Sequence, residues 1–336
     1  MTKYSLIITL ALFITSLSFT GCSSDDDEDY LGNWVRMADF DGIPRTEGVC
    51  FTIDNKAYIG TGYDIDNKER LTDFWVYDAE KDFWKQVASL PGLGRNGAIA
   101  FSSSTKGYVG TGYDGDNKLK DMYEYDPIDN AWMQKNDFPG TARYSATAFY
   151  VDGKGYMGTG YDNNYLKDFW SYDVDADSWT QITSMGGSKR RDAMNFVLNG
   201  EAYVLTGLNN GAYLDDMYKY DTAEDKWIEL GRISDYEDDS YDDDYTIARY
   251  KGVTFVMDGK AYVATGINGA NNQETWEYEP ATDRWTRKTD FEGTARSGAV
   301  GFSLNNIGYV ATGGNGSYSF DDVWKLNPSE EYENKD

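Results

Sequence analysis

The chain has 336 residues, and its 57 acidic against 31 basic side chains give a formal net charge of −26 at neutral pH. A surface with this much negative charge repels nucleic acid and anionic membranes. We therefore do not expect nucleic acid as a partner. The sequence contains no His, which excludes a Ser-His-Asp triad, a His general base and the usual His-containing metal sites.

The N-terminus has the pattern of an export signal. Residues 1–21 contain Lys3, an apolar stretch and then small residues before Cys22, which is typical of a cleaved signal peptide and not of a membrane span. The pattern is similar to a bacterial lipoprotein signal, in which Cys22 would become the lipidated first residue. The alternative is an ordinary signal peptide with an incidental Cys.

Residues 22–32 are predicted to be an acidic flexible tether, because five acidic residues follow one another at 25–29. This run resembles the export tag of some Gram-negative lipoproteins on the outer face of the outer membrane. We therefore expect a lipid-anchored protein of the outer membrane that faces the cell exterior. A periplasm-facing anchor is the alternative.

One pattern then occurs six times: Phe, Tyr seven residues later, and Thr-Gly three and four residues after that. The six runs are Phe51/Tyr58/Thr61-Gly62, Phe101/Tyr108/Thr111-Gly112, Phe149/Tyr156/Thr159-Gly160, Phe196/Tyr203/Thr206-Gly207, Phe255/Tyr262/Thr265-Gly266 and Phe302/Tyr309/Thr312-Gly313. A period near 50 residues indicates a radial repeat architecture.

Each unit is expected to form four short strands. In the third unit, residues 146–151 are the first strand, and Asp152-Gly153 is a hairpin turn before the second. The third strand begins at an acidic residue and alternates, as in 168–173, and a Trp opens the fourth. No segment has a sustained apolar period of 3.6 residues, so we expect very little helix.

The last unit lacks its Trp, because Glu333 stands where it is expected. Trp34 lies near the other end of the chain, and a propeller must close to remove its exposed strand edges. We therefore predict an all-β fold: a six-bladed β-propeller over residues 33–328, closed by an N-terminal outer strand that joins the last blade. Residues 329–336 would be a C-terminal tail.

The spacing, the Gly that ends the second strand, the Tyr-Asp pair and the Trp resemble kelch repeats. The resemblance covers nearly all of the mature chain. It departs from the family where the usual Gly-Gly doublet is mostly x-Thr-Gly, and where the His that often follows the kelch Arg is absent. Galactose oxidase is a kelch enzyme whose copper site needs His ligands, so the chain is not expected to be a galactose oxidase.

Two sets of residues are candidates for ligand binding on one face of the propeller. Each unit has an Arg before its first strand: Arg45, Arg95, Arg143, Arg191, Arg249 and Arg296. Converging guanidinium groups would bind carboxylate or sulfate; alternatively, each Arg bridges neighbouring blades. The loops on this face add Tyr63, Tyr113, Tyr144 and Tyr161, and Tyr beside Asp and Asn suits a sugar. Ordinary solvated loops are the alternative.

No metal site or cofactor is predicted, although the Asp-x-Asp-Asn strings faintly resemble calcium loops. The acidic segment 234–246 would be a lid, a cation site or a disordered loop. Cys50 is predicted to be a buried, inert thiol.

The expected function is that of a surface-exposed lipoprotein binding module for a glycan or protein ligand. The alternative is an enzyme similar to sialic acid mutarotase, which is another kelch protein. Such a carbohydrate isomerase needs an Arg for the sugar carboxylate and a carboxylate as acid and base, such as Arg296 with Glu47.

Overall fold

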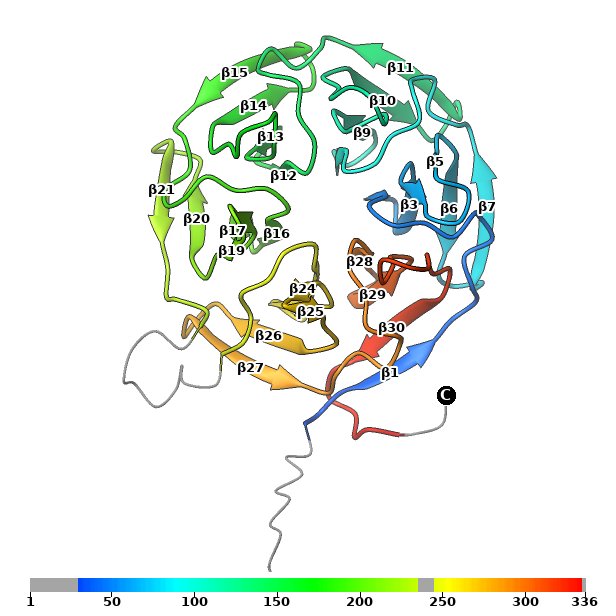
Figure 1. Cartoon of the computed structure of the whole chain (residues 1–336), viewed down its shortest axis with the longest axis vertical. Helices are drawn as coiled ribbons and strands as arrows, with labels where there is room; N and C mark the ends of the chain where they lie inside the picture. Colours follow the sequence, from blue (N-terminus) through cyan, green and yellow to red (C-terminus); the bar gives the residue numbers. More distant parts are fainter. Residues whose placement is uncertain (1–29, 235–244, 334–336) are drawn as a thin grey trace, which may run out of the picture.

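The computed structural model describes residues 30–234 and 245–333. Within these ranges the chain forms six four-stranded antiparallel sheets around a central axis, and no helix is present (Figure 1). The described residues thus offer no helical segment suited to crossing a membrane. The predicted signal peptide, most of the tether and most of the acidic segment 234–246 lie outside the described residues.

The repeat units correspond to the sheets, which we number as blades from the N-terminus. Blade 1 contains β2 (Val49–Ile53), β3 (Lys56–Gly60), β6 (Phe74–Asp78) and β7 (Phe83–Val87). Blade 2 contains β8 (Ile99–Ser102), β9 (Gly107–Gly110), β10 (Met122–Asp126) and β11 (Ala131–Lys135). Blade 3 contains β12 (Thr147–Val151), β13 (Lys154–Gly158), β14 (Phe169–Asp173) and β15 (Ser178–Ile182).

The second half continues the same order. Blade 4 contains β16 (Met194–Leu198), β17 (Glu201–Leu205), β20 (Met217–Asp221) and β21 (Lys226–Glu229). Blade 5 contains β22 (Val253–Met257), β23 (Lys260–Ala264), β26 (Thr275–Glu279) and β27 (Arg284–Lys288). Blade 6 contains β28 (Val300–Leu304), β29 (Ile307–Ala311), β30 (Val323–Asn327) and β1 (Asn33–Arg36).

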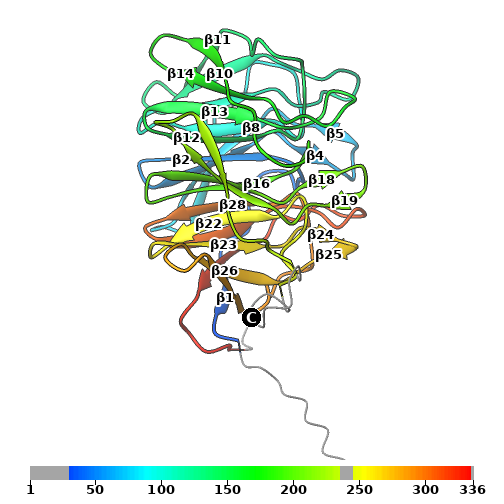
Figure 2. The same ribbon diagram turned by 90° about the vertical axis from the view of Figure 1, so that its left-hand side faces the viewer.

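Three short hairpins project from the loops between the second and third strands. They are β4 (Tyr63–Asp64) with β5 (Glu69–Arg70), β18 (Leu208–Asn209) with β19 (Ala212–Tyr213), and β24 (Ile267–Asn268) with β25 (Ala270–Asn271). The side view shows all three at the same end of the propeller axis (Figure 2).

The sixth blade combines the two ends of the described chain. β1 runs antiparallel to β30, with Trp34 opposite Leu326 and Arg36 opposite Trp324. The Trp34 side chain is fully buried and packs edge-on against Phe255 and Phe291 of the preceding blade region. β1 therefore occupies the outer position that β7, β11, β15, β21 and β27 fill in the other blades.

The repeated aromatic residues form the core between neighbouring blades. Phe51 stacks on Tyr58 with ring centroids 5.2 Å apart, and Tyr58 meets Tyr125 of the next blade at 5.5 Å. Gly107 allows this approach, because a Cβ there would lie 2.2 Å from the Phe51 ring. The repeat thus encodes packing of one sheet on the next, which accounts for much of the high aromatic content.

A polar latch joins the outer strands. In blade 3, the Tyr172 hydroxyl donates to Asp177 at 2.7 Å, and the same carboxylate accepts the backbone N–H of Asn136 from the preceding blade at 3.0 Å. The Trp179 indole donates back to the Asn136 carbonyl at 3.3 Å. The residues in the carboxylate position are Asp82, Asn130, Asp177, Asp225 and Asp283.

Candidate functional site

Five of the six arginines predicted to bind ligand are buried inside the blades. Every blade has one such buried Arg, which pairs with the acidic residue that precedes the third strand of the same blade. The pairs are Arg45–Asp73, Arg95–Asp121, Arg143–Asp168, Arg190–Asp216, Arg249–Glu274 and Arg296–Asp322. The exposed fraction of each Arg side chain is 0 or 1%.

Arg143 shows how completely these guanidinium groups are occupied. Its Nε donates to the Thr141 carbonyl at 3.1 Å, and a terminal nitrogen donates to the Thr159 carbonyl at 3.0 Å. Both terminal nitrogens also reach the Asp168 carboxylate, at 2.7 and 2.8 Å. Burial opposes ionisation of Asp168, but the hydrogen bonds and charge of Arg143 outweigh it and hold the pKa of Asp168 below its ordinary value.

These contacts correct the predicted role of five arginines: Arg45, Arg95, Arg143, Arg249 and Arg296. Their guanidinium donors are used within their own blade, so these side chains neither face a ligand nor bridge to a neighbouring blade. It is the backbone of each that reaches the preceding blade, as when the carbonyl of Arg95 accepts the Gly62 N–H at 2.7 Å. They act as struts that tie the loop before the first strand to the start of the third strand. A bidentate Arg–carboxylate pair suits this role because its planar geometry fixes both segments.

The fourth arginine of the predicted set was placed one residue out of register. Arg190, and not Arg191, is the buried strut of blade 4. The spacing to the Thr-Gly motif identifies it, since each strut Arg stands 16 residues before the Thr whose carbonyl it binds, as Arg143 does with Thr159. Arg191 instead lies on the face of the propeller.

That face is built from three short segments per blade, joined by isolated bridges or by the two-residue hairpins. The residue after the strut Arg pairs with the residue after Thr-Gly, in the pairs Thr46–Tyr63, Asn96–Tyr113, Tyr144–Tyr161, Arg191–Leu208, Tyr250–Ile267 and Ser297–Gly314. The residue after Thr-Gly also pairs with a residue later in the same loop, which from blade 1 to blade 6 is Arg70, Lys118, Tyr165, Tyr213, Asn271 and Ser319. All four predicted tyrosines therefore stand in these rows.

The side chains of blades 1 to 4 form a continuous run, which we call the tyrosine–arginine ladder: Tyr63, Arg70, Tyr113, Tyr144, Tyr161, Tyr165 and Arg191. The Arg70 guanidinium lies 5.0 Å from the Tyr63 ring centre and 4.9 Å from that of Tyr113. Tyr113 and Tyr144 are 5.6 Å apart between centroids. Every member is half-buried, so each keeps a surface open to solvent.

Arg191 ends the ladder on the blade 4 side. Its guanidinium lies over the rings of Tyr144, Tyr161 and Tyr165, at 6.0, 5.5 and 5.9 Å. One terminal nitrogen donates to the Tyr144 hydroxyl at 3.2 Å. Cations over aromatic faces are attracted by the ring quadrupole, and this attraction holds the Arg70 and Arg191 side chains in place.

The residues two positions after the strut arginines form a ring around the axis. They are Glu47, Gly97, Ser145, Asp192, Lys251 and Gly298, and all have positive φ between 53 and 62°. The N–H of each donates to the carbonyl of the ring residue in the preceding blade, at 2.7 to 3.3 Å, and the cycle closes from Glu47 to Gly298. We call this set the axial ring.

Three charged side chains of the axial ring meet across the axis. Lys251 donates to one oxygen of Glu47, and Asn96 donates to the other at 2.6 Å. Burial would raise the pKa of Glu47, but the charge and hydrogen bond of Lys251 hold it below its ordinary value. Burial together with the charge of Glu47 raises the pKa of Asp192. The two carboxyl groups are therefore driven toward different protonation states.

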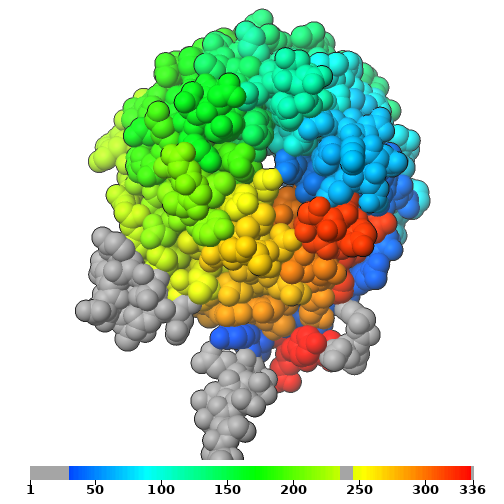
Figure 3. Space-filling model, in the orientation of Figure 1, coloured from blue at the N-terminus to red at the C-terminus, as the bar shows by residue number. Residues whose placement is uncertain are grey.

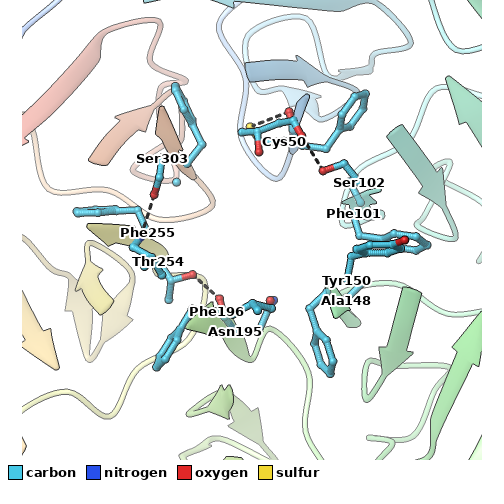
Figure 4. A pocket seen from close by; sticks show the side chains of 18 residues that line it. Cys50, Phe101, Ser102, Ala148, Tyr150, Asn195, Phe196, Thr254, Phe255 and Ser303 are labelled. Carbon is cyan, nitrogen blue, oxygen red and sulfur yellow. Dashed lines mark hydrogen bonds between the residues drawn. The ribbon is translucent and has the colours of Figure 1, made fainter. Parts of the chain in front are cut away.

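A channel of about 440 Å³ follows the axial ring along the axis, lined by the innermost strands of the six blades (Figure 4). Its wall contains Ala, Val, Ser, Thr and aromatic residues, with Asn195 and Cys50 but no charged side chain. Cys50 is a free thiol that is half-buried at this wall and also packs against the hydrophobic cluster between blades 6 and 1, so the thiol predicted to be buried is partly open to the channel. Burial raises the pKa of its thiol, which therefore stays protonated.

The structure brings four predicted tyrosines together with residues that the sequence did not single out, namely Arg70, Tyr165, Asn96, Asp192 and Lys251. Aligning the units on Thr-Gly would have placed these residues on one face. The described residues contain no group of acidic or Cys side chains suited to a metal ion. The Asp64 carboxylate of one calcium-like string accepts the backbone N–H groups of Asp66 and Asn67, at 2.9 and 3.2 Å.

Comparisons with known proteins agree on the architecture. The family model described as the kelch motif matches residues 155–186, and no curated protein matches the sequence. The solved structure of YjhT is similar, with a TM-score of 0.70 and 17% identity over 85% of this chain and 95% of that chain. With the six radial four-stranded sheets, these findings show a six-bladed β-propeller that contains a kelch motif at residues 155–186.

Proposed function

We propose that the protein is a binding module that recognises a glycan or protein ligand on the face formed by the tyrosine–arginine ladder and the axial ring. One observation carries the proposal: seven half-buried Tyr and Arg side chains contact one another across four blades while each keeps an exposed surface. Tyr rings offer flat apolar faces to sugar C–H groups, and Arg donors suit hydroxyl or acidic groups. Figure 3 shows this face, with a small opening at its centre.

The strut arginines leave this proposal unaffected because other cations serve the face. The Nε of Arg70 donates to the Asn96 side-chain oxygen at 2.7 Å, and its terminal nitrogens donate no hydrogen bond to any of the described residues. Lys251 and Arg191 add positive charge near the axis. Local positive charge acts on a bound anion despite a net charge of −26, since exposed charges beyond about 8 Å are largely screened in physiological salt.

We further propose that lipid at Cys22 anchors the propeller to the outer membrane and that the face is displayed to the cell exterior. The support is the sequence alone: the signal-like residues 1–21, Cys22 itself and the acidic run that follows. Metabolic labelling with a fatty acid tests it. Cys22→Ala should lose the label, and a mutant that still carries it would refute the anchor.

A second candidate function is a sialic-acid-mutarotase-like isomerase. The observation that favours it is the pair of carboxyl groups at the axis, Glu47 with a lowered and Asp192 with a raised pKa, close to Arg191. Such divergence suits one group as base and the other as acid. The pair suggested by the sequence, Arg296 with Glu47, is not available because Arg296 is bound to Asp322.

The experiment begins with a glycan array probed with the mature chain. Tyr144→Ala and Arg191→Ala should each weaken binding about tenfold or more, because each removes one stacking or charged contact. Tyr332→Ala is the control, since Tyr332 is an exposed tyrosine outside the ladder. Equal binding by all variants would move the site off this face. Faster exchange of N-acetylneuraminate anomers by NMR, lost in Asp192→Asn, would favour the isomerase.

A further inference from the structure

A groove on blade 1 continues outward from the ladder. It has a volume of about 400 Å³ and lies between the loop at Asp41–Ile43 and the segment Glu69–Asp73. Its floor is formed by Trp75 of β6 and Gln86 of β7, which are direct cross-strand partners. Arg70 lines the groove and is also a member of the ladder, so the two regions share a side chain.

We propose that this groove, which we call the Trp75 groove, is a second subsite that takes a neutral sugar unit of an oligosaccharide whose next unit lies over Arg70 and Tyr113. The inference rests on the proposed function of the face. It makes the ligand a chain of sugars and not a monosaccharide, because the ladder and the groove together exceed the length of one ring.

The position of Trp75 is suited to stacking. Its indole N–H donates to Asp73 at 2.7 Å, and its ring packs edge-on to Phe40 with centroids 5.9 Å apart. These contacts fix the ring while it remains half-buried at the groove. Gly42 lets the loop lie close, since a Cβ there would come 2.7 Å from the indole nitrogen. A fixed aromatic face binds a sugar ring with little loss of side-chain entropy.

The charges of the groove decide the kind of sugar. Asp41 and Glu69 are exposed at its edges, and the Asp73 carboxylate is held by Arg45. These carboxylates accept hydrogen bonds from hydroxyl groups and repel a uronate or sulfate. Arg70 is the one cation among the lining residues and stands at the inner end, toward the axis. A neutral unit therefore fits the groove, whereas an acidic unit fits the ladder.

A matched control exists in blade 3. Trp170 occupies the same place in its blade as Trp75, and its indole donates to Asp168 at 2.9 Å as Trp75 does to Asp73. Trp170 also packs edge-on to a Phe, Phe138, at 5.5 Å. Trp75→Ala and Trp170→Ala thus remove comparable structural contacts, and only the first removes a side chain that lines the Trp75 groove.

The test is an array of linear neutral and acidic oligosaccharides of one to six units, probed with the mature chain and both variants. We expect affinity to rise with chain length, and Trp75→Ala to lose about tenfold for the longer chains and nothing for single units. Trp170→Ala should keep the length dependence. Equal losses in the two variants, or single units that bind as tightly as chains, would overturn the Trp75 groove alone. No binding of any glycan to the parent would instead overturn the glycan form of the proposed function, on which the Trp75 groove rests.

Discussion

Replacing Arg143 by alanine should destabilise the propeller by about 3 kcal/mol without weakening ligand binding on the face. The substitution removes the donor that satisfies the buried Thr159 carbonyl at 3.0 Å, and an orphaned buried acceptor costs about 1–3 kcal/mol. It also leaves the Asp168 carboxylate without its cation, and breaking a buried pair in this way costs about 3–5 kcal/mol when the remaining charge is buried.

The lower end of that range applies because Asp168 is not fully enclosed. Its side chain keeps 24% exposure, and the indole of Trp170 still donates to it at 2.9 Å. Water and this remaining donor stabilise the carboxylate in the variant. Removing the charge as well, in Arg143→Ala with Asp168→Ala, should therefore restore part of the lost stability.

Urea denaturation followed by Trp fluorescence measures both effects, provided that the m-value is unchanged. Arg36→Ala is the control, because Arg36 pairs with Asp39 on the surface and should change stability by less than about 1 kcal/mol. A loss below 1 kcal/mol for Arg143→Ala, or a double variant less stable than the single one, would refute the strut. Weaker glycan binding at unchanged stability would return Arg143 to the ligand site.

Three further predictions concern the same scaffold. Asp177→Ala should lower the free energy of unfolding in urea by about 2 kcal/mol, since the buried Tyr172 hydroxyl and the Asn136 N–H lose their acceptor. An unchanged urea midpoint would show that the polar latch does not stabilise the fold. Deleting residues 30 to 40 should lower the melting temperature, because it removes buried Trp34 and uncovers an edge of β30; equal melting would argue against this role. Acid should unfold the protein below about pH 4. The folded-state pKa of Asp168 is lowered, so the contribution of this carboxylate to the free energy of unfolding is present above its unfolded-state pKa and is lost as the pH falls. Arg143→Ala should flatten that part of a stability profile, and an identical profile would contradict it.

The fold could be predicted because its determinants are local and repeated. The Phe, Tyr and Thr-Gly positions recur in register, and each packs against the neighbouring blade in the same way, as Phe51 and Tyr58 do against Tyr125. A residue that recurs in every unit serves the packing or the hydrogen bonds that every blade requires. The same logic accounts for the strut arginines. Ligand binding was expected of them, with bridging between blades as the alternative, because the direction of a side chain cannot be read from spacing.

The candidate site was only partly predictable, because its contacts join blades that are distant in the sequence. Lys251 and Glu47 are 204 residues apart and meet at the axis. Tyr113 and Tyr144 were found from their loops, but their stacking with Arg70 and Arg191 depends on the rotation from one blade to the next. Arg70 has no counterpart of its type in the other blades, so no repeat drew attention to it.

Departure from the repeat is what separates function from scaffold on this face. In the row that contains Arg70, the blades carry Arg70, Lys118, Tyr165, Tyr213, Asn271 and Ser319 in turn. Aromatic and basic side chains thus cover blades 1 to 4, whereas blade 6 contributes Ser297, Gly314 and Ser319 to the three rows. A purely structural face would repeat its residues as the strut arginines do. A ligand without sixfold symmetry selects different side chains in each blade, and the asymmetry of these rows is the pattern such a ligand requires.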